Sequence, residues 1–142
     1  MGSSDEFDWF EFNNLADSFI NEDNEAKQRT GISRYYYGTF CIARDFLKEN
    51  GIYLDNQSKK ILNSKNPEVH REISNIFKKH TQFQKNKYGR IISNDLNKLR
   101  KMRNEADYDS KTSHSLEYMM KKSKNKSERI LGILEKLNWW IN

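Results

Sequence analysis

Arg103 is the residue whose place in the sequence pattern most strongly suggests chemistry. It belongs to a series spaced by four, three, four and three residues: Ile92, Leu96, Leu99, Arg103 and Ala106. These spacings place the series on one face of an α-helix, where the pattern predicts an apolar residue at position 103. Because arginine is rarely buried without a partner, we expect Asp107, one turn later, to orient the guanidinium.

The polar residues around Arg103 leave two interpretations open. Asn104, Asp107 and Tyr108 follow it closely in the sequence. An arginine on the packing face of a helix, among such neighbours, forms either an ion pair in an interface or a site for an anion. The residues alone favour neither interpretation.

Apolar periodicity and capping residues predict the helices that must position this stretch. They cover about residues 9–22, 25–50, 67–80, 90–107 and 113–141. Gly51 is expected to close the second helix, with Asn66 and Ser113 as N-caps of the third and the last. Residues 58–62 suggest only a helical turn, and residues 81–89 are typical of a basic loop. The sequence therefore predicts an all-α fold, an up-and-down helical bundle of four to five helices. It forms one domain over residues 1–142, with a flexible lead over residues 1–8.

Composition limits the class of protein and its partners. Only 35% of residues are hydrophobic, yet 13% are aromatic, which favours a folded domain with a thin core. The net charge of +5 is compatible with nucleic acid but modest. The single cysteine, Cys41, excludes an internal disulfide, and no Cys/His cluster predicts a metal or cofactor site. With no long apolar run and no signal peptide, we expect a cytoplasmic protein that does not enter a membrane.

Three further features each have a structural and a functional interpretation. Tyr35, Tyr36 and Tyr37 fit packing in the core and at its rim, or a platform on which bases stack. The basic segment over residues 121–126 is either a solvated helix face or an edge that contacts phosphates. His70 is more typical of a structural residue than of a catalyst. Within the second helix, Gly38 indicates a place where another backbone approaches closely.

Three segments together resemble the HEPN family of small bacterial and archaeal domains. Residues 33–44 (Ser-Arg-Tyr-Tyr-Tyr-Gly-Thr-Phe-Cys-Ile-Ala-Arg) resemble the family's Arg-x-Tyr-Tyr-x-x-Phe-x-x-Ala-Arg motif. Residues 69–77 resemble the His-x-x-Ile-x-x-x-Phe segment that follows it, and residues 103–109 resemble an Arg-x-x-Ala-Asp-Tyr-Asp ending of the fourth helix. The resemblance extends over about residues 25–141, with the motifs in the same order.

The resemblance implies a HEPN-like bundle that forms a homodimer, with motif residues of both subunits facing a shared cleft. It implies a role in toxin–antitoxin or phage-defence systems, often beside a nucleotidyltransferase antitoxin. The family's ribonucleases carry an arginine and, four to six residues later, a histidine. Here Arg103 and Asn104 match the first half of that motif, whereas Tyr108 stands where the histidine is expected.

This departure affects the expected chemistry. Metal-free RNA cleavage needs a base for the 2′-hydroxyl, an acid for the leaving oxygen and a cation for the phosphorane charge. Arg103 is suited to be the cation. A tyrosine, with an ordinary pKa of about 10, is a poorer base at neutral pH than a histidine.

Three hypotheses follow for the function. The first is a toxin-like, metal-independent endoribonuclease acting on tRNA or mRNA, with Arg103 holding the phosphate and Asn104, Asp107 and Tyr108 as orienting residues. The second is a non-catalytic HEPN module that binds RNA or nucleotide, or that a nucleotidyltransferase modifies on Tyr108. The third is a structural role, in which the Arg103–Asp107 pair holds a dimer interface together.

Overall fold

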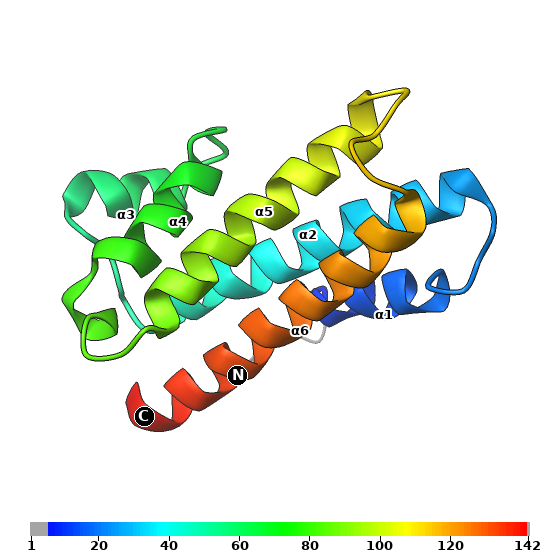
Figure 1. Ribbon diagram of the computed structural model, residues 1–142. Helices are drawn as coiled ribbons and strands as arrows, with labels where there is room; N and C mark the ends of the chain where they lie inside the picture. Colours follow the sequence, from blue (N-terminus) through cyan, green and yellow to red (C-terminus); the bar gives the residue numbers. More distant parts are fainter. Residues whose placement is uncertain (1–5, 142) are drawn as a thin grey trace.

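The computed structural model describes residues 6–141, and the side chains of residues 6–138. This part of the chain is all-helical, as predicted. Its α-helices are α1 (Phe10–Ser18), α2 (Glu25–Glu49), α3 (Asn56–Leu62), α4 (Val69–Lys79), α5 (Tyr88–Tyr108) and α6 (Leu116–Ile141), with a short 3-10 helix η1 (Thr81–Phe83). The three long helices lie side by side, α5 running opposite to α2 and α6, and α3 and α4 lie together at one end (Figure 1).

Helix α2 is the centre of the bundle and packs against α1, α4, α5 and α6. Tyr35 and Tyr36 are buried, which confirms the packing interpretation for these two tyrosines, while Tyr37 is half-buried at the rim. The larger of two core clusters draws its side chains from α2 through α6, and the smaller joins α1, α2, α5 and α6. Burial of this apolar surface is the main stabilising contribution to the bundle.

Capping residues set the two ends of α2. The side chain of Asn24 accepts a hydrogen bond from the backbone N–H of Lys27 at 3.0 Å, which begins the helix. Gly51, with φ of 62°, follows the C-cap Asn50 and lets the N–H of Ile52 reach the carbonyl of Leu47 at 2.9 Å. The left-handed conformation is one that glycine adopts without strain, so the prediction for Gly51 is confirmed.

Two of the predicted capping residues were wrong, and one helix was missed. Asp55 caps α3 by accepting from the N–H of Ser58 at 2.7 Å, so a full helix forms where only a turn was expected. Helix α4 begins at Val69, and Asn66 instead supports the turn before it through the N–H of Glu68. Ser115 rather than Ser113 receives the N–H of Tyr118 at the start of α6. The described residues therefore contain six α-helices instead of four to five.

Two glycines mark close approaches between helices. At Gly38 an added Cβ would collide with the side chain of Asn13 on α1, so the close neighbour is a side chain and not the backbone expected. At Gly89 an added Cβ would collide with the carbonyl of Phe77. Gly89 was assigned to a loop, but it lies in the first turn of α5, where it lets α5 contact α4. No helix in the described residues is long and apolar enough to cross a membrane.

The lead predicted over residues 1–8 lies partly outside the described residues. In its described part, the Phe7 ring packs against the rings of Trp9 and Phe12, with centroids 5.1 Å from each. The indole N–H of Trp9 donates to the carboxylate of Asp45 at 3.0 Å, which ties this end of the chain to α2.

Candidate functional site

Arg103 lies on the face of α5 that packs against α2. Its side chain is almost covered within the single chain, and the whole residue is 7% exposed. The guanidinium lies over the rings of Tyr37 and Tyr36, at 5.0 and 5.4 Å from their centroids. Such cation–π contacts are attractive and fix the plane of the guanidinium.

The positive charge here is poorly neutralised. The buried Nε–H groups of Arg100 and Arg103 have no hydrogen-bond partner in the described part of the chain. Among the described residues, Asp107 is the one carboxylate within ion-pair distance of either guanidinium, and it lies 3.9 Å from Arg103 Nη1. Asp107 also accepts a hydrogen bond from Ser33 at 3.2 Å. A buried cation without full compensation costs several kcal/mol, so an added anion would be stabilising.

His70 of α4 joins this group through the hydroxyl of Tyr36, which is hydrogen-bonded to its Nδ1. Its ring also stacks on Phe40, with centroids 4.2 Å apart. Burial, together with the positive charges of Arg100 and Arg103, lowers the pKa of His70 to about 4. Burial raises the pKa of Tyr36. At neutral pH a protonated Tyr36 hydroxyl therefore donates to a neutral imidazole, whose proton lies on Nε2.

We call this set the arginine cluster: Tyr36, Tyr37, His70, Arg100 and Arg103. Of the four predicted site residues, the structure brings Arg103 and Asp107 together. Asn104 is exposed, and Tyr108, at the end of α5, is 76% exposed. His70 was judged a structural residue. Two sequence features could have pointed to the residues that the structure adds to the site. Arg100 lies three residues before Arg103 and so shares its helix face, and His70 is the histidine of residues 69–77.

Arg29 of α2 positions the end of α5 that carries the site. Its Nη1 donates to the carbonyls of Glu105, Ala106 and Asp109 at 3.3, 2.9 and 2.7 Å, and its Nη2 to Ser110 at 3.2 Å. The Glu105 carbonyl also accepts the N–H of Asp109 at 3.0 Å, and the guanidinium adds donors for the carbonyls that follow it, which complements the negative end of the helix dipole. Sequence reasoning missed this residue, because its partners lie more than seventy residues away.

A second basic site lies on the α6 side of α5. It is a pocket of about 310 Å³ lined by Lys98 and Lys101 of α5, Lys122 and Lys126 of α6, and residues at the start of α6. There the ring of Tyr118 stacks on His114 with centroids 4.9 Å apart. The pocket contains part of the basic segment over residues 121–126 and gives its lysines an aromatic neighbour.

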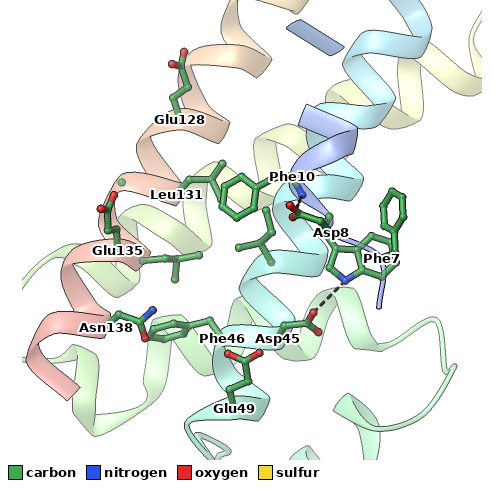
Figure 2. Close-up of a pocket in the computed structure, with 14 residues that line it drawn as sticks. Phe7, Asp8, Phe10, Asp45, Phe46, Glu49, Glu128, Leu131, Glu135 and Asn138 are labelled. Carbon is green, nitrogen blue, oxygen red and sulfur yellow. Dashed lines mark hydrogen bonds between the residues drawn. The ribbon is translucent and has the colours of Figure 1, made fainter. Parts of the chain in front are cut away.

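A larger hollow, about 660 Å³, has the opposite charge. It lies between α2, α6 and the residues that precede α1 (Figure 2). We call it the acidic groove. Its charged lining residues are Asp8, Asp45, Glu49, Glu128 and Glu135. Carboxylates repel phosphate, so this groove is not a candidate for binding RNA. In the described residues, no three His, Cys, Asp or Glu side chains are grouped so as to hold a metal ion.

Comparisons with known proteins give one relative and no assignment. The chain is 37% identical over 90 residues to an uncharacterized protein of Methanocaldococcus jannaschii, a match covering 60% of this chain and 51% of the relative. The chain thus spans about half the length of that relative. No family model matches the chain, and no solved structure matches it.

Proposed function

We propose that this chain is a HEPN-type toxin or defence protein that binds cytoplasmic RNA as a dimer, with Arg103 contacting a backbone phosphate. The observation that carries the proposal is the uncompensated charge of the arginine cluster. Two guanidiniums have buried Nε–H groups without partners, and one carboxylate lies at 3.9 Å. A phosphate at the exposed edge of the guanidinium would supply the missing negative charge.

The kinds of donor in the cluster suit a phosphate. A guanidinium presents a planar fork of N–H donors that matches two phosphate oxygens, and Tyr36 and Tyr37 hold that plane in place. The Nε2–H of neutral His70 offers a further donor near the two arginines. Because His70 carries no charge at neutral pH, it adds a hydrogen bond without increasing the repulsion among the cations.

An extended polyanion fits the molecule better than a small anion does. The second basic site, the pocket lined by Lys98, Lys101, Lys122 and Lys126, lies on the α6 side of α5. Basic groups therefore occupy two sides of one helix. RNA presents phosphates at regular intervals and bases that stack on aromatic rings such as Tyr118. The lysines then add affinity that falls with salt, while the arginine cluster fixes one phosphate.

Metal-independent cleavage is the further step that the resemblance to HEPN ribonucleases implies. His70 supports it, because a histidine beside a phosphate site is the side chain best suited to exchange protons in RNA cleavage. A phosphate bound at Arg100 and Arg103 would offset the charges that lower the pKa of His70, and so bring that pKa closer to neutral. We therefore give the proton-transfer role to His70, because Tyr108, which stands where the family's histidine is expected, is a poor base at neutral pH.

A second candidate function rests on the exposure of Tyr108. Its side chain is accessible at the end of α5, whereas Tyr35 and Tyr36 are buried. An accessible hydroxyl is what a partner nucleotidyltransferase antitoxin would need to modify. Mass spectrometry of the chain after incubation with such an enzyme and ATP tests this alternative, with Tyr108→Phe as the control that must lose the added mass.

The main test compares wild type with Arg103→Ala, Arg103→Lys and Arg90→Ala. The last variant removes an exposed arginine from the same helix and is the matched control. We expect Arg103→Ala to weaken binding of single-stranded RNA by about 30–100-fold, as for loss of a hydrogen bond between charged groups. Arg103→Lys should rescue it only in part, because an ammonium lacks the planar fork. Equal RNA binding by Arg103→Ala and Arg90→Ala would overturn the proposal.

Cleavage is read in the same samples with EDTA present. Fragments ending in 2′,3′-cyclic phosphate, absent with Arg103→Ala and with His70→Gln, would establish the ribonuclease. RNA that is bound but remains intact would leave a binding module. Sedimentation of each variant reports whether the dimer is retained, which separates loss of binding from loss of assembly.

A further inference from the structure

The acidic groove combines an apolar floor with an acidic rim. Its floor includes Phe7, Phe10, Ile42, Phe46, Leu131 and Leu134. Phe7 and Phe10 are each 47% exposed, so part of this floor is open to solvent. Exposed apolar side chains gathered in a hollow with polar residues around them mark a place where another molecule binds.

Five carboxylates surround the groove, and two of them are ion-paired within the chain: Asp45 with Arg44 at 3.1 Å and Glu128 with Lys124 at 3.7 Å. Glu128 and Glu135 lie on the α6 wall, Asp45 and Glu49 on the α2 wall, and Asp8 beside Phe10 (Figure 2). No lysine or arginine is among the described residues that line the groove. The whole chain has a net charge of +5, so this concentration of carboxylates runs against the overall composition. A cationic ligand would therefore be favoured at Asp8, Glu49 and Glu135, for which the described residues provide no ion-pair partner.

A second copy of the chain is a poor occupant on these grounds. In a twofold-symmetric dimer, residues meet their own counterparts only at the twofold axis. A dimer with the groove on that axis would bring the carboxylates of both subunits together, and like charges brought together in an interface cost several kcal/mol. We therefore expect the dimer of the proposed function to use a different surface.

We infer that the acidic groove docks a basic amphipathic helix from another protein. Apolar residues on one face of that helix would cover Phe10, Phe46 and Leu131, and lysines or arginines on either side of that face would meet the rim carboxylates. Gly132 of α6 lines the groove, and an added Cβ there would meet no atom within 4 Å, so this part of the groove is open. The groove shares no residue with the arginine cluster, so this inference does not depend on RNA binding.

Gly132 allows the groove to be filled with little disturbance of the fold. Gly132→Trp places a large ring in the groove, while Asn125→Trp places the same ring at an exposed position of α6 outside it. The double variant Glu128→Gln, Glu135→Gln removes two rim charges. Glu117→Gln, at the start of α6, is its control. Circular dichroism and thermal melting confirm that each full-length variant is folded.

The probe is a fluorescent amphipathic helix of leucine and lysine, about 18 residues long, followed by anisotropy at about 0.15 M salt. Two control peptides replace its lysines with glutamate or its leucines with serine. We expect the leucine–lysine peptide alone to bind tightly. Gly132→Trp and the double glutamine variant should each raise its Kd at least about tenfold, whereas Asn125→Trp and Glu117→Gln should leave it unchanged.

Several results would overturn the inference. Binding that Gly132→Trp leaves unchanged would place the peptide elsewhere on the surface. Equal binding of the serine–lysine peptide would show that binding depends on charge alone and that the apolar floor has no role. A dimer that Gly132→Trp converts to monomer would assign the groove to a second copy of this chain.

Discussion

The arginine cluster and the acidic groove are both built on α2, at different turns of the helix. In the arginine cluster the charge is buried, held against Tyr36 and Tyr37, and only partly compensated by Asp107. In the acidic groove the carboxylates surround apolar side chains that remain in part exposed. The first region has an electrostatic deficit that a small anionic group can satisfy, whereas the second has apolar surface that only a larger partner can cover.

The two proposed sites would allow one small bundle to serve two kinds of partner. A buried guanidinium recognises one phosphate through fixed geometry, and its selectivity comes from the cost of leaving it unpaired. A groove recognises a helix through area and uses its rim charges mainly to select the sign of the partner. Because the two regions have opposite charge, we expect RNA to avoid the groove and a basic helix to avoid the arginine cluster.

The largest expected effect is a separation of the two binding activities. Arg103→Ala should lose about 30–100-fold in RNA affinity while the leucine–lysine peptide binds as to wild type. Gly132→Trp should show the reverse pattern. Anisotropy with both probes on the same preparations makes the comparison. Loss of both activities in either variant would mean that the two regions are one site.

The next effect concerns protonation of the arginine cluster. His70 has a pKa of about 4 in the folded chain, below its ordinary value of 6.5, so the unfolded chain binds more protons between these values. The stability it contributes is therefore complete above about pH 6.5 and is lost as the pH falls towards 4. Allowing for the partial exposure of the ring, we expect the loss to be roughly 1–2 kcal/mol.

Urea denaturation of wild type and His70→Gln at several pH values measures this loss. The difference in unfolding free energy between the two proteins should shrink as the pH falls from 7 to 4.5. His114→Gln, which removes an exposed histidine before α6, is the control. A constant difference between wild type and His70→Gln would mean that His70 is not held neutral by burial and by Arg100 and Arg103.

A smaller effect tests whether the acidic groove is open. Gly132 lies in α6 with nothing within 4 Å of an added Cβ, so Gly132→Ala should raise the unfolding free energy by about 0.5–1 kcal/mol through helix propensity. Gly89→Ala is the contrasting variant and should be destabilising, because its Cβ would collide with Phe77 and Phe83. A destabilising Gly132→Ala would show that other atoms already fill this part of the groove.

How much of the fold and of the candidate site could be predicted from the sequence depends on how far apart the interacting residues lie along the chain. The helix period alone identified Arg103 as out of place and Asp107 as its neighbour, because both lie on one helix. His70 lies on another helix, α4. Its contact with Tyr36 follows from tertiary packing, which no local sequence pattern predicts. The HEPN resemblance singled out residues 69–77 without giving His70 a role.

The acidic groove was not predicted for a similar reason. Asp8, Asp45 and Glu128 are each an ordinary surface acid in their own segment, and only the packing of α1 and α6 on α2 gathers them. Helix α3 was missed for a local reason. Its hydrophobic residues are too few to show a period, so the N-cap Asp55 was the signal, and polar residues on either side concealed it.

The smallest effect concerns Asp107, which has opposite roles under two interpretations. If Asp107 competes with phosphate for Arg103, then Asp107→Asn should tighten RNA binding about two- to fivefold, because a partly exposed pair at 3.9 Å is worth less than about 1 kcal/mol. If Asp107 instead orients the guanidinium, as its spacing from Arg103 suggested, the same variant should weaken binding. We expect the tighter binding, because Tyr36 and Tyr37 already fix the guanidinium plane.

Asparagine keeps an oxygen that accepts from Ser33, so Asp107→Asn changes charge with little change in packing. Asp109→Asn is the matched control, because it removes an exposed carboxylate from the same end of α5. An equal gain in both variants would reflect only the net charge of the protein. A gain confined to Asp107→Asn, measured by anisotropy at low and moderate salt, would locate the bound phosphate at Arg103, whereas weaker binding would return Asp107 to its orienting role.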